Sequence, residues 1–336
     1  MKIVLFLGAG FSAPFGLPVM NAFIRSAHDR RRLNDQEKAF LDELVMEARR
    51  ANSFLQTSPT NLEDILSLCV MQDRLAMPGV SLPRTPRIVR ILQKMYTDPG
   101  EVDAYWSRLE VLETFLGDAL KKPSHAVSIV TTNYDLIIES ACRQIDVPVS
   151  YPLQHKPYPA DDNVQVHGQL TQSDGFTLCK LHGSVNWFMV DDELHVEDRV
   201  VAVQSMARAN TTLPRVCTAN YKNSHYPLII PPSFLKPDLP GPISSVWQSA
   251  AKALHESDQI AFVGYSFPSS DIEMKYFLAS SLANNPRLRR IDVIDPNATA
   301  LVARLKRETE SGFGNHFREL LNPVQSDWTH ATLQLA

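Results

Sequence analysis

Residues 3–18 read IVLFLGAGFSAPFGLP, and this stretch constrains the fold more than any other part of the chain. The apolar run at 3–7 ends directly in glycine, which is typical of a buried parallel strand. A G-x-G-x-x-A pattern then runs from Gly8 to Ala13. A strand, a glycine loop and a helix start in this order can bind a pyrophosphate, because the glycines let the main chain approach it and the helix end supplies N–H donors. A tight strand-to-helix turn without a ligand is the alternative.

The next segment departs from the dinucleotide fold of dehydrogenases. That fold has a second strand ending in an acidic residue about 20 residues after the glycines, where it binds the adenine ribose. Asp29 stands near that distance, but its surroundings, SAHDRRRLNDQ, are too polar for a buried strand. Any dinucleotide bound here must therefore take its remaining contacts from elsewhere in the chain.

Further strand-like segments end in small or polar residues. They lie at 126–131, 177–181, 259–264 and 290–295. Ligands of open α/β sheets bind at the carboxyl ends of the strands, so these residues are candidates for one site. They are Asn133, Asp135, His182, Gly264, Ser266 and Asp295.

Strands that alternate with helices predict an α/β fold with a doubly wound, Rossmann-like parallel sheet. We expect a single domain over 1–336, with a helical block of about 20–120 inserted into it. Helical spacing marks 34–51, 58–76 and 103–120 within this block, with Ser and Thr as caps before the second. The sequence further predicts a hairpin at 185–197, a proline-rich loop at 227–242, a helix at 271–283 that begins with a Ser270–Glu273 capping box, and a final helix near 297.

Composition narrows the function classes. The net charge is −4 and the sequence pI is about 6.2, which argues against direct nucleic-acid binding. No stretch approaches the ~18 apolar residues of a membrane span, and glycines rather than a cleavage site follow the apolar start. We therefore expect a cytoplasmic protein with no membrane partner. The four cysteines are scattered without a CxxC pair, so no bound metal is expected.

Six motifs in order, GAGFS, TTNYD, KLHGSVNW, PPSFLK, GYSFPSSD and IDP, resemble the sirtuin-like family over roughly 1–300. The similarity is greatest to the bacterial sirtuin-like NAD-hydrolysing domains of antiphage defence systems. The resemblance implies that Asn133 binds the nicotinamide ribose and positions the nucleophile, that Asp135 holds the nicotinamide carboxamide, and that His182 is the general base. It places other cofactor-binding positions at Gly8, Ala9, Gly10, Phe11, Ser12, Gly264, Ser266 and Asp295, the last where sirtuins usually have asparagine.

Two departures from sirtuin deacylases bear on the activity. Deacylases carry a four-cysteine zinc module between the histidine and the later glycine motif, and this chain has only Cys217 there, so we expect no zinc ribbon. The helical block replaces the usual short cofactor loop. Together these features predict a metal-independent NAD glycohydrolase, with NAD as substrate, that depletes NAD in abortive infection. An NAD-dependent protein deacylase and a non-catalytic NAD- or ADP-ribose-binding subunit are the alternatives.

Two further expectations concern partners and a second histidine. Because NAD loss is toxic, we expect activity to be controlled by homo-oligomerisation, by a separate ATPase or nucleic-acid-guided defence protein, or by both, with the helical block as the contact surface. His167-Gly168 is another His-Gly pair near the predicted base. The KLHGSVNW surroundings favour His182 over His167.

Overall fold

The computed structural model describes residues 1–29, 33–55, 60–77, 82–97, 102–120, 125–157, 176–190, 193–196, 227–230, 241–268, 271–283, 285–308 and 314–330. Within these ranges the main sheet has seven strands in the order β11-β10-β9-β1-β2-β5-β3, and all neighbours pair in parallel. The strands are β1 (Lys2–Leu7), β2 (Ala126–Thr131), β3 (Val149–Ser150), β5 (Phe176–Lys180), β9 (Gln259–Val263), β10 (Arg290–Asp295) and β11 (Leu321–Gln325). The predicted α/β class and parallel sheet are confirmed.

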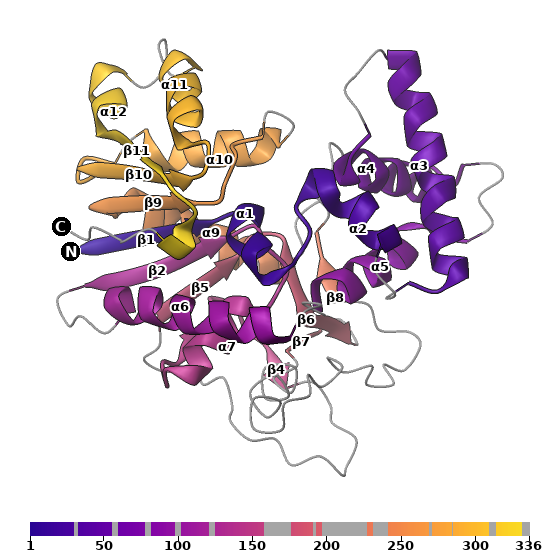
Figure 1. The fold of residues 1–336 in the computed structure, drawn as a ribbon, viewed down its shortest axis with the longest axis horizontal. Helices are drawn as coiled ribbons and strands as arrows, with labels where there is room; N and C mark the ends of the chain where they lie inside the picture. The colour runs from indigo at the N-terminus through magenta and orange to yellow at the C-terminus, as the bar shows by residue number, and fades with distance from the viewer. Residues whose placement is uncertain are drawn as a thin grey trace.

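The central strand β1 is apolar because both faces of the sheet are covered. Its residues 3–7 are fully buried in the main core. Figure 1 shows α6 (Val102–Leu120) and α7 (Ile137–Gln144) in front of the sheet and α9 (Gly241–His255) behind it. The remaining helices after α9 are α10 (Ile272–Leu282), α11 (Ala298–Glu308) and α12 (Gly314–Leu320).

The order of the strands creates a binding crevice. From β1 the chain moves outward through β2, and it later returns to β9 on the other side of β1. The connections after β1 and β9 therefore diverge at the carboxyl ends of two adjacent strands. Such a topological switch point is where open α/β sheets bind ligands.

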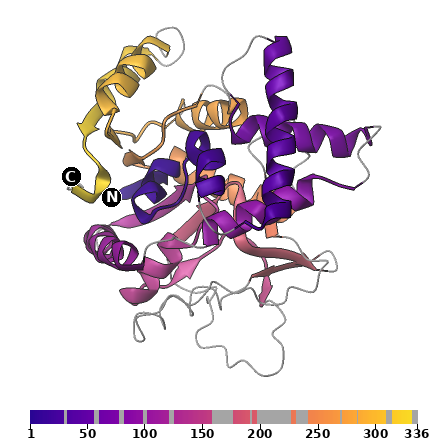
Figure 2. The same cartoon turned by 45° about the vertical axis from the view of Figure 1, so that its right-hand side comes forward.

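The helices between β1 and β2 divide between two hydrophobic cores. Helices α2 (Phe23–Asp29), α3 (Asp35–Leu55), α4 (Leu62–Arg74) and α5 (Thr85–Thr97) share a core of their own. They stand beyond the carboxyl ends of the strands, at the right of Figure 1 and in Figure 2. Helix α6 instead packs in the core of the sheet. Of the segment 20–120, the part formed by α2–α5 is thus a separate layer, which we call the helical block.

The helical block is fastened to the sheet through the loop after β2. Its core includes Tyr134 and Leu136 from that loop, together with Val185 and Ile229. Inside the block the buried Arg84 guanidinium donates to Glu43 at 2.6 Å and to Glu47 at 2.8 Å. The block is therefore packed against the edge of the sheet that holds the candidate site residues.

A second, smaller sheet has the order β4-β7-β6-β8 in the described part of the chain. Its strands are β4 (Lys156–Pro157), β6 (Gly183–Val190), β7 (Glu193–Val196) and β8 (Pro227–Ile229). The antiparallel pairing of β6 with β7 confirms the predicted hairpin. Among the described residues, no helix is both long and apolar enough to span a bilayer.

The prediction of an irregular loop over 227–242 is wrong at both ends. Residues 227–229 pair with β6 as an edge strand, where proline is tolerated because its missing N–H can face away from the ladder. At the other end α9 begins at Gly241. Residues 231–240 lie outside the described ranges, as do Asp191 and Asp192 at the hairpin turn.

The glycines at the crevice give a test of the fold. Gly264 has φ of +60°, and a Cβ there would lie 2.2 Å from the Phe11 nitrogen. Gly264→Ala should therefore destabilise the protein by at least about 1–3 kcal/mol, from backbone strain alone. Gly117→Ala is the matched control, because Gly117 lies in α6 with nothing within 4 Å of the added methyl. Urea unfolding should show a loss for the first variant and a small gain for the second, and equal stabilities would contradict the account.

Candidate functional site

One cavity of about 420 Å³ lies at the carboxyl ends of the strands. This volume falls within the usual range of small-molecule sites. Nine of the residues predicted from the sequence line it. They are Ala9, Gly10, Ser12, Asn133, Asp135, His182, Gly264, Ser266 and Asp295.

The other two predicted positions, Gly8 and Phe11, are not among the lining residues. The Phe11 ring is buried and stacks on Trp328, with ring centroids 4.8 Å apart. The Trp328 indole N–H also donates to the Phe11 carbonyl at 2.9 Å. A Cβ at Gly8 would lie 2.6 Å from the Gly264 carbonyl oxygen. Both residues thus shape the glycine loop, and neither side-chain position faces the cavity.

The glycine loop rests directly on the end of β9. The Gly8 amide donates to the Val263 carbonyl at 3.0 Å, and the Gly10 amide donates to the Gly264 carbonyl at 2.8 Å. A Cβ at Gly10 would lie 2.9 Å from Gly264, so the close contact between the two loops requires glycine at both positions. This contact joins the two loops of the switch point into one wall.

Asn133 is held by the loop in front of it. Its Nδ2 donates to the Gly8 carbonyl at 2.8 Å and to Ser12 Oγ at 2.9 Å, and its main-chain amide donates to Thr131 Oγ1 at 3.0 Å. Thr131 Oγ1 in turn donates to the Leu7 carbonyl at 3.0 Å. Since an amide nitrogen carries two hydrogens, the side-chain atom left for a ligand is Oδ1, an acceptor. Asn133 can therefore accept a hydrogen bond from a hydroxyl group or a water in the cavity.

Asp135 is buried beside it. Its Oδ2 accepts from Ser12 Oγ at 2.7 Å and its Oδ1 accepts from the Ile137 amide at 3.1 Å. Burial raises the pKa of this carboxyl, while the Lys180 ammonium and the Ser12 hydrogen bond act in the opposite direction. Each carboxylate oxygen has a second lone pair, so a carboxamide N–H from a ligand can still be accepted.

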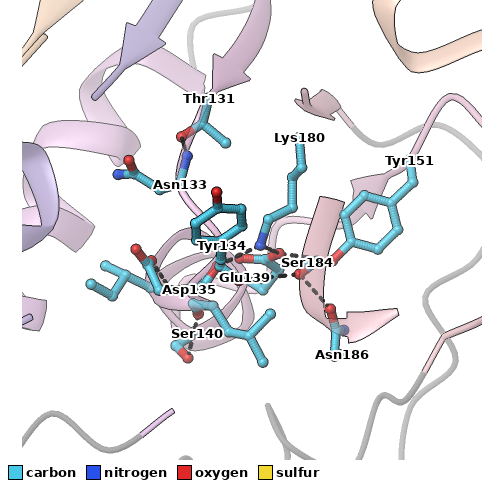
Figure 3. Close-up of polar contacts among 12 residues, drawn as sticks. Thr131, Asn133, Tyr134, Asp135, Glu139, Ser140, Tyr151, Lys180, Ser184 and Asn186 are labelled. Atoms are coloured by element: carbon cyan, nitrogen blue, oxygen red, sulfur yellow. Dashed lines mark hydrogen bonds and ion pairs between the residues drawn. The ribbon is translucent and has the colours of Figure 1, made fainter. Parts of the chain in front are cut away.

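A buried ion pair lies beside this turn (Figure 3). Lys180 Nζ and Glu139 Oε1 are 2.8 Å apart, and both side chains are only 1% exposed. Lys180 also donates to the Asp135 carbonyl, and the Tyr151 hydroxyl donates to Glu139 Oε1 at 2.8 Å. The pair therefore ties the end of β5 to α7 and to the Asn133–Asp135 turn. This ion pair was not predicted from the sequence, although a lysine at the end of an apolar strand was a visible signal.

His182 lies between β5 and β6 and is 2% exposed. Its ring centroid is 6.3 Å from that of Tyr134 and 6.4 Å from that of Trp247. The main chain on both sides is fixed, since the Ile230 amide donates to the His182 carbonyl and the Trp247 indole N–H donates to the Leu181 carbonyl, each at 2.8 Å. His182 thus forms a fixed wall of the cavity. His167 lies outside the described residues.

Sequence reasoning missed the contribution of the helical block and of several aromatic and acidic residues. The block supplies Asn61, Glu63 and Tyr96 to the lining, and Met20 and Asn21 line it from the segment just before α2. Further lining residues without a predicted role are Pro18, Val19, Thr132, Tyr134, Tyr265, Pro268 and Asp271. Tyr134 and Tyr265 stood inside quoted motifs, and Tyr265 follows a predicted strand, but the sequence predicted no role for either residue.

Two helix caps at the cavity differ from expectation. Helix α4 is capped by Asn61 in a capping box with Asp64, in place of the predicted Ser or Thr. Helix α10 is capped by Asp271, whose Oδ1 accepts from the Met274 amide at 3.2 Å. Ser270 of the predicted Ser270–Glu273 box lies outside the described residues. Asn and Asp are as effective as Ser at this position. In the described ranges no group of three or more His, Cys, Asp and Glu side chains is arranged to hold a metal ion.

The buried ion pair predicts a large effect on stability. Lys180→Met leaves the Glu139 carboxylate buried without its countercharge and should cost roughly 3–5 kcal/mol of unfolding free energy. Lys180→Met combined with Glu139→Leu removes both charges and should recover much of that loss. Chemical denaturation measures both variants. Additive losses in the double variant would show that the two side chains do not interact.

The raised pKa of Asp135 predicts a pH dependence. The folded protein holds the Asp135 proton more tightly than the unfolded chain does, so ionising this group opposes folding. Its contribution to stability therefore falls as pH rises from the ordinary aspartate pKa through the raised one. Relative to wild type, Asp135→Asn should become more stable between about pH 4 and about pH 7. Urea unfolding at the two pH values measures this difference, and a constant difference would contradict the prediction.

Comparison with known proteins places this geometry in a family. No curated protein matches the chain. Solved structures resemble it at low identity: a sirtuin from a study of the structural basis of sirtuin substrate affinity (12% identity, 98% of this chain and 90% of that chain, TM-score 0.42), and Sir2Tm bound to a propionylated peptide (12%, 98% and 89%, 0.36). A third is a Sir2 structure with a p53 peptide and NAD+ (12%, 98% and 89%, 0.37). Residues 127–313, more than half of the chain, match the SIR2-like domain. The chain therefore belongs to the SIR2-like family.

Proposed function

We propose that the protein is an NAD glycohydrolase, which cleaves the nicotinamide–ribose bond of NAD to give nicotinamide and ADP-ribose. The observation that carries the proposal is the convergence of Ser12, Asn133, Asp135 and His182 on one cavity at the switch point of the sheet. These residues come from three separate strand ends. One of the Sir2 structures of similar fold was solved with NAD+.

The reaction needs positioning more than covalent chemistry. When the C1′–N bond breaks, its electron pair moves to the nicotinamide nitrogen, which becomes neutral, and positive charge develops on the ribose as in glycoside hydrolysis. A water then forms the new C–O bond at C1′ and loses a proton. The site must hold the carboxamide and the ribose and admit one oriented water.

The polar groups of the cavity suit these tasks. Asn133 Oδ1 is the acceptor that remains after its two N–H bonds, so in the proposal it orients a ribose hydroxyl or the attacking water. Asp135 accepts the carboxamide N–H. His182 takes the proton of the water, since imidazole is the side chain best suited to proton transfer near neutral pH. No step in this scheme requires a metal.

Other residues of the cavity lining are assigned to the phosphates and the adenosine. The main-chain amide of Ala9 lies at the start of α1 (Ala9–Ser12), where the first N–H groups have no acceptor within the helix. Ser266 and Asp295, at the ends of β9 and β10, are exposed enough to contact ribose hydroxyls. In the proposal these residues bind the pyrophosphate and the adenine ribose.

Point variants test the assignment. Asn133→Ala and His182→Ala should each lower nicotinamide release by at least about 10²-fold, because each removes a group that orients or deprotonates the nucleophile. His255→Ala, at the exposed end of α9, is the matched control and should retain full activity. Nicotinamide is measured by chromatography after incubation with NAD.

The same assay separates the alternatives. Cleavage that occurs only with an acyl-lysine peptide, and that yields O-acyl-ADP-ribose, would show a deacylase in place of a hydrolase. Tight NAD binding without nicotinamide release, measured by calorimetry, would show a binding subunit. Full activity of both Asn133→Ala and His182→Ala would contradict the assignment of the site.

We also propose that the enzyme acts in antiphage defence as an NAD-depleting effector that is held inactive until a signal arrives. Uncontrolled NAD loss would harm its own cell, so control by self-assembly, or by a separate ATPase or nucleic-acid-guided protein, belongs to the proposal. Large exposed apolar side chains on or next to α3, α4 and α5 in the chain support a contact surface on the block. They are Met46, Phe54, Met71, Leu75, Met77 and Leu82.

Light scattering tests this part of the proposal. The mass in solution should exceed the 37.7 kDa of one chain, either alone or with the product of a neighbouring gene. Leu75→Asp and Phe54→Asp should reduce that mass without lowering the unfolding temperature. A monomer under every condition, with full NAD cleavage, would contradict control by assembly.

A further inference from the structure

The helical block closes one side of the cavity. Pro18 and Tyr96 both line it, and the Tyr96 hydroxyl donates to the Pro18 carbonyl at 3.1 Å. The Tyr96 ring meets the Tyr134 ring edge-on, with centroids 5.7 Å apart. Since Tyr134 stands between Asn133 and Asp135, the block is held against the turn that carries the proposed site. Residues of the block that line the cavity are thus fixed relative to that turn.

Glu63 is the acidic residue that the block places in this cavity. It is the second residue of α4, lines the cavity and is only 5% exposed. The helix does not need this carboxylate, because Asn61 and Asp64 already form the capping box. Leu62, Ile65 and Leu66 around it fill the core of the block. Glu63 therefore brings a carboxylate from the block into the lining of a ligand-sized cavity.

The charged residues that line the cavity indicate which kind of ligand group Glu63 would contact. The described lining includes the carboxylates of Glu63, Asp135, Asp271 and Asp295, and no lysine or arginine. Glu63 and Asp271 act on the same two tyrosines: beyond the effect of burial, both raise the pKa of Tyr134 and of Tyr265. Glu63 thus shares the cavity with the Asn133–Asp135 turn and with Tyr265 after β9. The charge of the described lining as a whole therefore favours a cation.

Bound NAD carries its positive charge on the nicotinamide ring, and during cleavage that charge moves to the ribose. We propose that Glu63 is a catalytic carboxylate that faces the nicotinamide ribose and stabilises this positive charge as the C1′–N bond breaks. Glu63 forms no covalent bond: the electron pair leaves with nicotinamide, and the proton of the attacking water goes to His182. The inference rests on the proposed function and adds to it a residue from the helical block.

Kinetics of Glu63→Gln test the inference. The amide keeps the shape of the side chain and one acceptor oxygen, but it replaces the other oxygen with an NH2 donor and removes the charge. We expect kcat for nicotinamide release to fall by about 10²-fold or more, while the thermal midpoint is unchanged. Glu43→Gln is the matched control, because Glu43 lies in the same block, is 52% exposed at its side chain and bonds Arg84 outside the cavity. The control should keep wild-type kcat, and a wild-type kcat in Glu63→Gln would overturn the inference.

Ligand affinity gives a readout that does not depend on turnover. In a His182→Ala background, calorimetry compares NAD+ with NADH, whose nicotinamide ring is neutral. Adding Glu63→Gln should weaken NAD+ binding by about tenfold and leave NADH binding within about twofold, because only the cation loses a countercharge. Equal effects on the two ligands would overturn the charge role.

The two proposals fail in different ways. If wild-type protein binds NAD+ but releases no nicotinamide, the hydrolase assignment fails and the ratio of NAD+ to NADH affinities alone decides the role of Glu63. If wild type is active and Asn133→Ala is not, but Glu63→Gln is unchanged in both kcat and affinity ratio, only the inference about Glu63 fails.

Discussion

The hydrogen bonds among Ser12, Asn133 and Asp135 are the interaction on which the site depends. Asn133 donates to Ser12, and Ser12 donates to Asp135, so a residue after β1 and two residues after β2 are linked side chain to side chain. The Lys180–Glu139 ion pair supports this link, because Lys180 also donates to the Asp135 carbonyl. Because a buried polar network is stable only when every member is satisfied, the loss of one member exposes the others to an unfavourable environment. The geometry of the proposed reaction and the stability of the fold are therefore coupled at this point.

The helical block has two roles in this account. Its own core makes it a stable layer, and its contacts with Tyr134 attach it to the end of the sheet. At the same time it lines the cavity with Asn61 and Glu63 from the start of α4. A segment inserted between two strands thus contributes residues to the site that those strands create.

Much of the fold was predictable from the sequence, and the reasons are local. Strands such as β1 and β2 are short apolar runs between polar or glycine residues, and strand ends of a parallel sheet meet at one edge whatever the intervening chain does. That is why nine predicted residues from distant positions line one cavity. The proline-rich segment misled the prediction because the pairing of 227–229 with β6 is a tertiary contact that no local pattern encodes. The burial of Lys180, Glu139 and Glu63 was not predicted for a similar reason. A charged residue becomes buried only when separate elements pack together.

Proton NMR of NAD+ incubated with the wild-type protein tests the central claim most directly. The account predicts that the nicotinamide and ADP-ribose signals rise together in equal amounts as the NAD+ signals decline, and that no acyl-peptide is needed. NAD+ signals that broaden on binding but persist undiminished, in the free protein and in every assembly it forms, would contradict it.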